Sequence, residues 1–205
     1  KIFPSLALVD YSYLKTSSYS GMKSTCVDAL AHMIESRLNT NANAFSRAYA
    51  EEGMKLWARC KDCLETEESF AHMTDEEFAT FMQASVLAGM AIAYTGTSIP
   101  HGLSYTLTYE NGVPHGKAVG VFLSGFLKNY GDSVEAEYVV RQLLGFDNFD
   151  AFRDYIRTLF GKLDMSEKLW KKDRDGILAN PAKLKNYPFE LTADVLDDYV
   201  RYYNA

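Results

Sequence analysis

The sequence predicts an all-α, multi-helix domain with one short strand at its N-terminus. Three observations favour this fold class. Apolar residues recur with the 3.6-residue period of an α-helix through most of the 205 residues. Thr, Pro and Gly stand where helices are expected to begin and end. Hydrophobic residues make up 47% of the chain and aromatic residues 14%, which is enough for one substantial core or two modest ones.

The chain opens with a short apolar run, residues 2–10, that has the form of a single β-strand. A lone strand is not stable, so we expect its partners to be missing or to lie elsewhere in a longer protein. Residues 1–10 are interpreted as the residual strand of another domain, and residues 11–205 as a helical domain. The pattern suggests two sublayers in this domain, residues 11–130 and residues 131–205.

The first helix is expected at residues 20–39, where apolar residues at 27, 30, 34 and 38 form one stripe, and the second at residues 44–61. A third helix, residues 74–94, begins with a capping box because Thr74 precedes Glu77 by three positions. Its second half carries small and apolar side chains on all faces, which is typical of a helix packed on several neighbours. Gly96 ends it, and Pro100 can begin the next helix.

Residues 103–113 follow, with a turn signal at Asn111 and Gly112. Five further helices are expected at residues 117–130, 134–144, 149–161, 166–178 and 192–203. Gly131 ends the first of these five.

The formal net charge of -6 disfavours nucleic acid as a partner, because phosphate binding needs a concentrated basic face. The basic residues near position 170 alternate with acidic residues, and this pattern predicts a solvated helix face. No apolar run approaches the roughly 20 residues of a membrane span, and the first residues lack the charged, apolar and small-residue pattern of a signal peptide, so we expect a cytoplasmic protein without a membrane partner. Three cysteines suit a reducing compartment, and we interpret the isolated pair Cys60 and Cys63 as structural thiols.

Three of the four histidines lie in patterns that favour metal binding. Asp28 and His32 are four residues apart in a predicted helix, so that both side chains project from one face. His101 and His115 each stand between a proline and a glycine. Proline restricts the backbone before the imidazole, and glycine removes a side chain that could crowd an approaching ion or substrate.

Asp28, His32, His101 and His115 therefore form a candidate four-ligand metal site. Imidazoles with one carboxylate suit Fe(II), Zn(II) or a related first-row ion. Such an ion is a Lewis acid that can bind a hydroxyl oxygen and polarise the carbonyl formed on oxidation. The fourth histidine, His72, lies before the helix at residues 74–94 and is assigned a structural or solvent-exposed role.

These motifs resemble the C-terminal half of the iron-containing, group III alcohol dehydrogenases. The resemblance rests on Asp-Ala-Leu-x-His-x-Ile-Glu at residues 28–35, on the small-residue run at 84–91 and on the His-Gly-Leu-Ser to Pro-His-Gly block at 101–116. It extends to residues 4–10 and to the C-terminal segment, and so covers nearly the whole chain. It implies the helical fold shared by these enzymes and dehydroquinate synthase, with Asp28, His32, His101 and His115 as the ligands.

The resemblance further implies NAD or NADP as cofactor of the full-length enzyme, bound by an N-terminal nucleotide-binding domain of which residues 1–10 would be the last strand. It implies a small alcohol or aldehyde as substrate, and a homo-oligomer. Tyr105 stands where many members of the family have a second histidine, and as a possible proton donor it is the candidate catalytic residue. No glycine-rich pyrophosphate loop occurs in the 205 residues, so the chain alone is expected to bind metal without turning over.

Two other functions are compatible with the sequence. A metal-dependent hydrolase or lyase could use the same ligands to activate water, but it needs a general base. Glu35 is the nearest acidic candidate, and because its spacing from His32 turns it toward a neighbouring face, we predict a solvent or capping role for it. A non-catalytic helical module, with packed histidines, is the third hypothesis.

Overall fold

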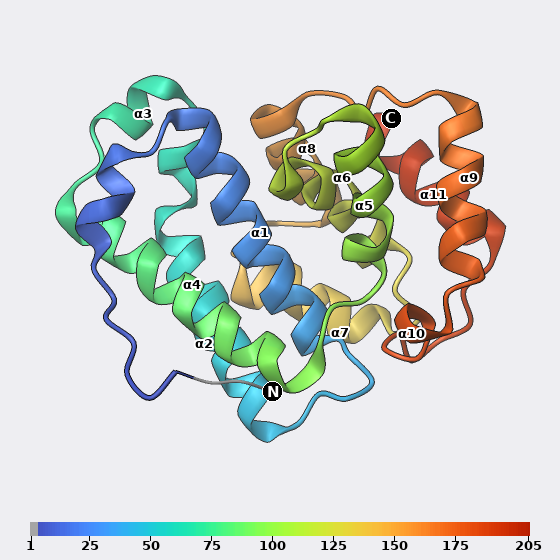
Figure 1. Cartoon of the computed structure of the whole chain (residues 1–205), viewed down its shortest axis with the longest axis horizontal. Helices are drawn as coiled ribbons and strands as arrows, with labels where there is room; N and C mark the ends of the chain where they lie inside the picture. The colour runs from blue at the N-terminus through green and yellow to red at the C-terminus, as the bar shows by residue number, and fades with distance from the viewer. Residues whose placement is uncertain (1–3) are drawn as a thin grey trace.

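The computed structural model describes residues 4–205, and within this range every regular element is a helix (Figure 1). The all-α fold class is thus confirmed. Residues 4–10, which cover most of the predicted strand, form no strand, and residues 1–3 lie outside the described range. The difference has a simple cause, since a strand needs a neighbour with which to exchange backbone hydrogen bonds.

The elements up to residue 95 form one side of the molecule (Figure 1). They are η1 (Tyr11–Thr16), α1 (Tyr19–Arg37), α2 (Ala44–Cys60), η2 (Lys61–Leu64), α3 (Glu67–Ala71) and α4 (Asp75–Thr95). The predicted capping box at the start of α4 is present, because Thr74 accepts the backbone N–H of Glu77 while the Glu77 carboxylate accepts that of Thr74.

The other side holds the remaining elements (Figure 1). They are α5 (Ile99–Asn111), α6 (His115–Lys128), α7 (Ser133–Glu137), the π-helical turn η3 (Tyr138–Leu143), α8 (Phe149–Phe160), α9 (Glu167–Leu178), α10 (Pro181–Leu184) and α11 (Ala193–Asn204). The segment expected as one helix at 134–144 is therefore a short α-helix that continues as a wider turn. Gly112, with φ of 65°, ends α5 in the left-handed region that glycine tolerates.

α1 lies between the two sides and packs against α2 and α4 on one flank and against α5 and α6 on the other (Figure 1). Val27, Leu30 and Ile34, three of the predicted stripe residues, are completely buried on it. Contacts of α6 with α8 and α11 extend the same hydrophobic core across residue 130. α1 is thus the rigid central element on which a functional site can be built.

The length and apolar composition of α4 would also suit a membrane span. In the structure, however, α4 packs along both α1 and α2, and Phe81, Ala84, Ala88 and Ala91 on it are buried. This is the position of a core helix, as its small apolar residues predict.

Candidate metal centre

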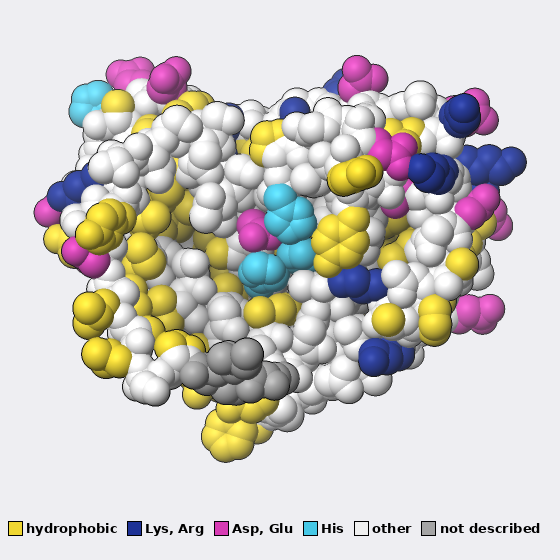
Figure 2. Space-filling view, in the orientation of Figure 1, with side chains coloured by type: hydrophobic (Ala, Val, Ile, Leu, Met, Phe, Trp, Pro, Cys, Tyr) yellow, Lys and Arg dark blue, Asp and Glu magenta, His cyan; other side chains and the backbone are white. Residues whose placement is uncertain are grey.

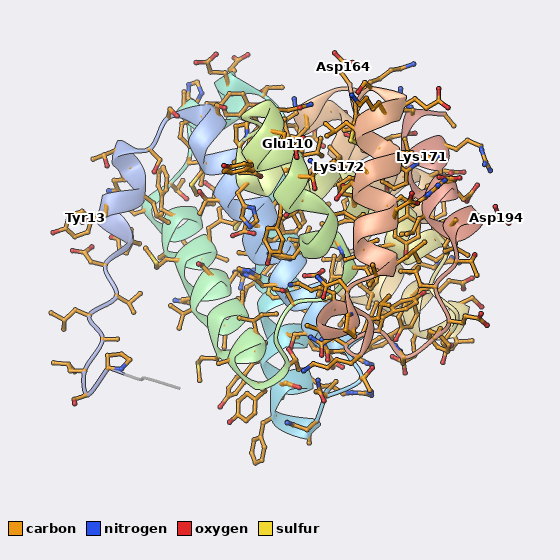
Figure 3. The ribbon with its side chains drawn as sticks, turned by 45° about the vertical axis from the view of Figure 1, so that its right-hand side comes forward. Tyr13, Glu110, Asp164, Lys171, Lys172 and Asp194 are labelled. Atoms are coloured by element: carbon orange, nitrogen blue, oxygen red, sulfur yellow. The ribbon has the colours of Figure 1, made fainter. Side chains whose placement is uncertain are left out.

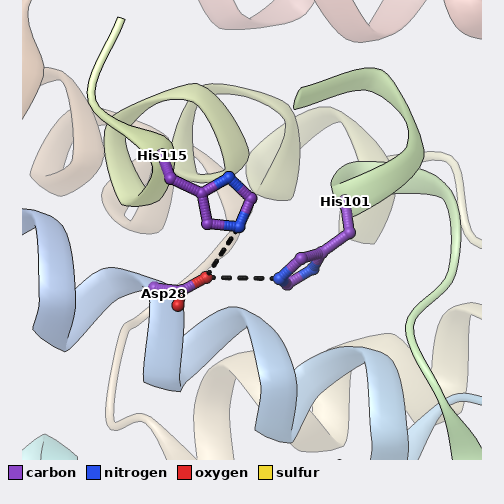
Figure 4. A group of neighbouring side chains, drawn as sticks. All are labelled: Asp28, His101 and His115. Atoms are coloured by element: carbon purple, nitrogen blue, oxygen red, sulfur yellow. Dashed lines mark hydrogen bonds and ion pairs between the residues drawn. The ribbon is translucent and has the colours of Figure 1, made fainter. Parts of the chain in front are cut away.

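Asp28, His101 and His115 converge although they come from three different helices (Figure 4). One potential ligand atom from each of these residues lies within 4.8 Å of the other two. The Asp28 carboxylate oxygen Oδ1 is 3.2 Å from His101 Nε2 and 3.5 Å from His115 Nε2. The structure therefore brings together three of the four side chains that the sequence singles out.

His32, the fourth, lies beside this group on the same face of α1 as Asp28. Its Nε2 atom is 3.9 Å from Asp28 Oδ1, and its ring stacks on that of His101 with centroids 4.7 Å apart. Metal bonds of about 2.0–2.2 Å in a tetrahedral site would separate neighbouring ligand atoms by roughly 3.3–3.6 Å. The distances of His101 Nε2 and His115 Nε2 from Asp28 Oδ1 lie close to this range, so these three side chains fit a small divalent cation, while His32 Nε2 lies somewhat farther out.

The glycine after His115 allows α6 to begin directly against α1. A Cβ atom at Gly116 would lie 1.7 Å from the carbonyl oxygen of Ser24, one helical turn before Asp28. Any other residue would push the start of α6, and His115 with it, away from the carboxylate.

The glycine after His101 has a comparable packing role. A Cβ atom at Gly102 would meet the Ile177 side chain at 2.3 Å and the stem of Lys183 at 3.5 Å. The sequence interpretation, that both glycines clear space for an ion or substrate, is therefore corrected. They make room for neighbouring protein segments, which fix the two histidines in place.

The sequence reasoning misassigned Glu35, which contacts a proposed ligand in the structure. Instead of reaching solvent or capping a helix, it is completely buried, and its Oε1 atom accepts the backbone N–H of His101 at 3.1 Å. Its Oε2 atom is paired with His101 Nδ1. A carboxylate in this position fixes the ring orientation and leaves Nε2 directed at Asp28, the arrangement commonly found behind a metal-binding histidine.

The electrostatics of the cluster favour a cation. Burial alone would lower the pKa of His101, but the charges and hydrogen bonds of Glu35 and Asp28 outweigh it and raise the pKa to about 10. Burial would raise the pKa of Asp28, but His101 and the other two imidazoles lower it. Burial lowers the pKa of His32 and so favours its neutral form, the form that binds metal. His101 has the opposite tendency, and an ion bound at its Nε2 atom would have to replace the proton held there.

Tyr105 lies at the edge of the cluster and presents its hydroxyl to a lysine. Its ring is parallel to that of His115, with an interplanar angle of 5° and centroids 6.3 Å apart, and the residue is 50% exposed. The Tyr105 hydroxyl oxygen accepts a hydrogen bond from Lys183 Nζ at 3.2 Å. Figure 2 shows histidine side chains in the hollowed centre of this face of the molecule, with an apolar ring and a basic side chain close by.

The remaining candidate residues lie away from this cluster. His72 is exposed at the end of α3, where its Nδ1 atom is 2.8 Å from the carbonyl oxygen of Glu68. Cys60 is buried, and burial together with a hydrogen bond to Glu77 raises the pKa of Cys63 to about 12. Neutral thiols of this kind suit the structural role predicted for the pair.

The predicted basic helix face is α9, which lies along α5. Figure 3 shows Lys171 and Lys172 on α9, with Glu110 of α5 next to Lys172. Lys172 and Glu110 form an ion pair, and Arg174 pairs with Asp197 at 3.0 Å. Acidic partners thus accompany this basic segment, as its composition predicts.

Sequence comparison agrees with the geometry of the site. The model of the Fe-containing alcohol dehydrogenase family, C-terminal, matches residues 22–175, a segment that contains Asp28, His32, His101 and His115. The chain belongs to this family. The resemblance that the motifs indicate is thereby confirmed.

Two curated relatives act on different alcohols. A 4-hydroxybutyrate dehydrogenase from Clostridium kluyveri is 23% identical over 99% of this chain and 58% of its own length. A 1-propanol dehydrogenase from Citrobacter freundii is 26% identical over 60% of this chain and 32% of its own length. The chain thus spans about half or less of the length of the relatives that it matches.

Solved structures share the fold. An iron-containing alcohol dehydrogenase from Thermotoga maritima superposes with a TM-score of 0.86 at 30% identity and covers 99% of this chain and 54% of that one. A sulfoacetaldehyde reductase from Bifidobacterium kashiwanohense, solved in complex with NAD+, superposes with a TM-score of 0.80 at 28% identity, over 99% of this chain and 55% of that one.

Proposed function

We propose that this chain is the helical, metal-binding part of an NAD(P)-dependent alcohol dehydrogenase that interconverts alcohols with aldehydes or ketones. The observation that carries the proposal is the convergence of three imidazole nitrogens on one carboxylate oxygen in a member of this family. In this proposal Asp28, His32, His101 and His115 hold Fe(II) or Zn(II). When bound, the ion would polarise the oxygen of the alcohol or carbonyl substrate.

The side chains around the cluster have separate tasks in this proposal. Glu35 holds the His101 ring through Nδ1 and the backbone N–H, so that Nε2 keeps its direction during the reaction. Tyr105 is the candidate catalytic residue. Because its oxygen accepts from Lys183, its own proton remains available for exchange with a substrate oxygen near His115.

We place the nicotinamide on a nucleotide-binding domain outside these 205 residues, with residues 1–10 as its last strand and residues 11–205 as the metal-binding domain. The lack of a glycine-rich pyrophosphate loop in the sequence supports this division. A cytoplasmic homo-oligomer that acts on a small alcohol or aldehyde, without nucleic acid or membrane partners, completes the proposal and rests on composition and family resemblance.

In this structure Glu35 is not placed to act as the general base that the hydrolase or lyase alternative needs. Glu35 was its nearest acidic candidate, but both carboxylate oxygens of Glu35 are used by His101 and the residue has no exposed surface. A group that activates water needs to reach that water directly or through one bridging molecule. We therefore favour the dehydrogenase.

Metal analysis of purified chain tests the proposal. After loading with Fe(II) or Zn(II) and gel filtration, the wild type should retain about one equivalent of metal, as should the control variant His72→Ala. His101→Ala and His115→Ala should lose the metal while circular dichroism still shows a helical fold. Metal retained by both variants would contradict the proposed ligands and leave the histidines as packed residues of a non-catalytic module.

Cofactor titration tests the division of labour. The metal-loaded chain alone should not bind NAD+ or NADP+ detectably in a calorimetric titration. The full-length protein that carries the nucleotide-binding domain should reduce one of them in the presence of a primary alcohol. Tight cofactor binding by residues 1–205 would refute the separate nucleotide site.

A further inference from the structure

A lysine without an acidic partner lies next to the candidate metal centre. Lys183 Nζ donates one hydrogen bond to the Tyr105 hydroxyl at 3.2 Å and another to the Thr97 hydroxyl. Among the described residues no carboxylate forms a salt bridge with it, whereas the nearby Lys172 and Arg174 are both paired with acids. An ammonium group has three donors, so one donor and the full positive charge remain available to a ligand.

Local structure holds this lysine in place. The Asn180 side chain caps the short helix α10 by accepting the backbone N–H of Lys183 at 3.2 Å, and Pro181 begins that helix. Three residues after the lysine, the buried Asn186 donates to the Thr97 carbonyl oxygen at 2.7 Å. The segment that carries Lys183 is therefore held by Asn180 before the lysine and by the bond from Asn186 to Thr97 after it. This lowers the entropic cost of ordering the ammonium group.

The stem of Lys183 crosses α5 next to a proposed ligand. It passes within 3.5 Å of where a Cβ of Gly102 would lie, directly after His101, and its ammonium lies over the Tyr105 ring at 5.1 Å from the centroid. The Tyr105 ring is parallel to His115. A short substrate whose oxygen is held at the histidine cluster would therefore extend along the tyrosine ring toward the lysine.

We propose that Lys183, held in place by the hydroxyls of Thr97 and Tyr105, forms a carboxylate-binding subsite, and that the substrate is a short ω-hydroxy acid or the matching aldehyde acid. This inference rests on the proposed dehydrogenase function, because it assumes that the alcohol end of the substrate is held at the histidine cluster. It deepens that function by choosing between the two kinds of alcohol that curated relatives use, a hydroxy acid and a plain alcohol. The carboxylate would take the third N–H of Lys183, a charge-assisted bond that a neutral alcohol cannot form.

Binding to the metal-loaded chain gives the first test. Calorimetric or NMR titration would compare 4-hydroxybutyrate with 1,4-butanediol, which has the same length but no charge. The wild type should bind the acid more tightly than the diol. Lys183→Met should lower the affinity for the acid by roughly ten- to a hundredfold, which is the effect of losing a hydrogen bond to a charged group. Lys185→Met, which removes a neighbouring exposed lysine, should leave the preference for the acid as it is in the wild type.

Turnover by the full-length protein gives the second test. The ratio of kcat/KM for 4-hydroxybutyrate to kcat/KM for 1-propanol should fall by roughly ten- to a hundredfold in Lys183→Met. An equal loss for both substrates with a shifted pH profile would overturn the subsite and assign Lys183 to the activation of Tyr105. Weakened NAD+ binding with an unchanged substrate ratio would also overturn it and identify the anion as the phosphates of the cofactor.

The two proposals fail in different ways. If the full-length wild type oxidises neither alcohol with NAD+ or NADP+, the dehydrogenase function fails, while the titrations still decide whether Lys183 binds a carboxylate. If the wild type turns over and Lys183→Met keeps the wild-type preference in both experiments, the subsite fails and the dehydrogenase stands. Binding of 4-hydroxybutyrate that requires the metal but not Lys183 would show that the carboxylate goes to the ion, and would overturn the subsite.

Discussion

Glu35 and Asp173 are both buried carboxyl groups that meet α5, the first from α1 and the second from α9, yet their surroundings differ. Glu35 faces His101, which offers a backbone N–H and a ring nitrogen to its two oxygens. Asp173 receives only the hydroxyl of Thr106, at 2.8 Å, and its Oδ2 atom is buried without a partner. Burial is similar in the two cases, with exposed fractions of 0% and 5%.

The difference shows what keeps a buried carboxylate charged. A histidine can supply positive charge as well as hydrogen bonds, and His101 does so with a pKa of about 10. At Asp173 burial raises the pKa to about 7; the Thr106 hydrogen bond lowers it in part, and the negative charge of Glu110 adds to the increase. One carboxylate thus supports the candidate metal centre, while the other is a source of pH-dependent instability.

The largest effect that tests this comparison is expected for Glu35→Ala. Removal of Glu35 leaves the buried His101 with Asp28 as its remaining carboxylate partner and takes away the acceptor of its Nδ1 atom and backbone N–H. Breaking a buried pair in this way costs about 3–5 kcal/mol of unfolding free energy. Asp173→Ala at pH 8 should cost much less, because it also removes an unfavourable buried charge. Urea denaturation of both variants gives the two values, and equal losses would contradict the different roles of the two carboxylates.

Asp173→Asn should stabilise the protein in a pH-dependent way. An aspartate in the unfolded chain has a pKa of about 3.9, and Asp173 in the folded protein has a pKa of about 7. Between these values the folded state keeps the proton that the unfolded state has released, so wild-type stability falls as the pH rises through this window. The amide variant should therefore be more stable by about 4 kcal/mol at pH 8, and the advantage should shrink as the pH is lowered toward 4.

Thermal melts of wild type and Asp173→Asn from pH 4 to pH 8 provide the measurement. Asp175→Asn is a suitable control because Asp175 is exposed on the same helix. An advantage of Asp173→Asn that is equal at pH 4 and pH 8 would show that the carboxyl group does not titrate in this range.

Glu35→Gln sharpens the comparison at the metal centre. The amide keeps the shape of the side chain and one acceptor for His101, but it removes the negative charge behind the ring. Loss of such a supporting carboxylate typically weakens metal binding by roughly 10- to 100-fold. Competition with a chromophoric chelator measures this, with Asp173→Asn as the control that should keep wild-type affinity; an unchanged affinity in Glu35→Gln would leave Glu35 with a packing role only.

Helix positions could be predicted from the sequence because their signals are local, and local motifs also led to the four proposed ligands, three of which the structure brings together. The capping box at Thr74 and the Asp28/His32 spacing each involve residues within one or two helical turns. Glu35 was misassigned because its position was judged from His32, three residues away. Counted from Asp28, seven residues away, it returns to the same helix face, so the sequence did contain the signal for its inward position.

Other features depend on contacts between distant segments and could not be predicted. Lys183 meets Tyr105 across 78 positions of the chain, and Asp173 meets Thr106 across 67. No periodicity reports such pairs, because they are set by how α5, α9 and α10 pack together. The roles of Gly102 and Gly116 were obscured for the same reason, since only the neighbouring helix shows what a side chain would strike.

The smallest effect is expected for Thr106→Val, which removes the only side-chain hydroxyl that the structure places on Asp173 Oδ1. At pH 8 the lost bond is to a charged carboxylate, and the expected cost is about 2 kcal/mol; at pH 5 the bond is between neutral groups and the cost is about 1 kcal/mol. Thr108→Val, two residues away, is the matched control, because the Thr108 hydroxyl is buried without a partner and its removal should cost nothing measurable. The pKa of Asp173 should rise further in Thr106→Val, so that the fall in stability continues to a higher pH than in the wild type. Urea denaturation at the two pH values checks this, and a cost that does not increase from pH 5 to pH 8 would mean that Thr106 does not stabilise the charged form of Asp173.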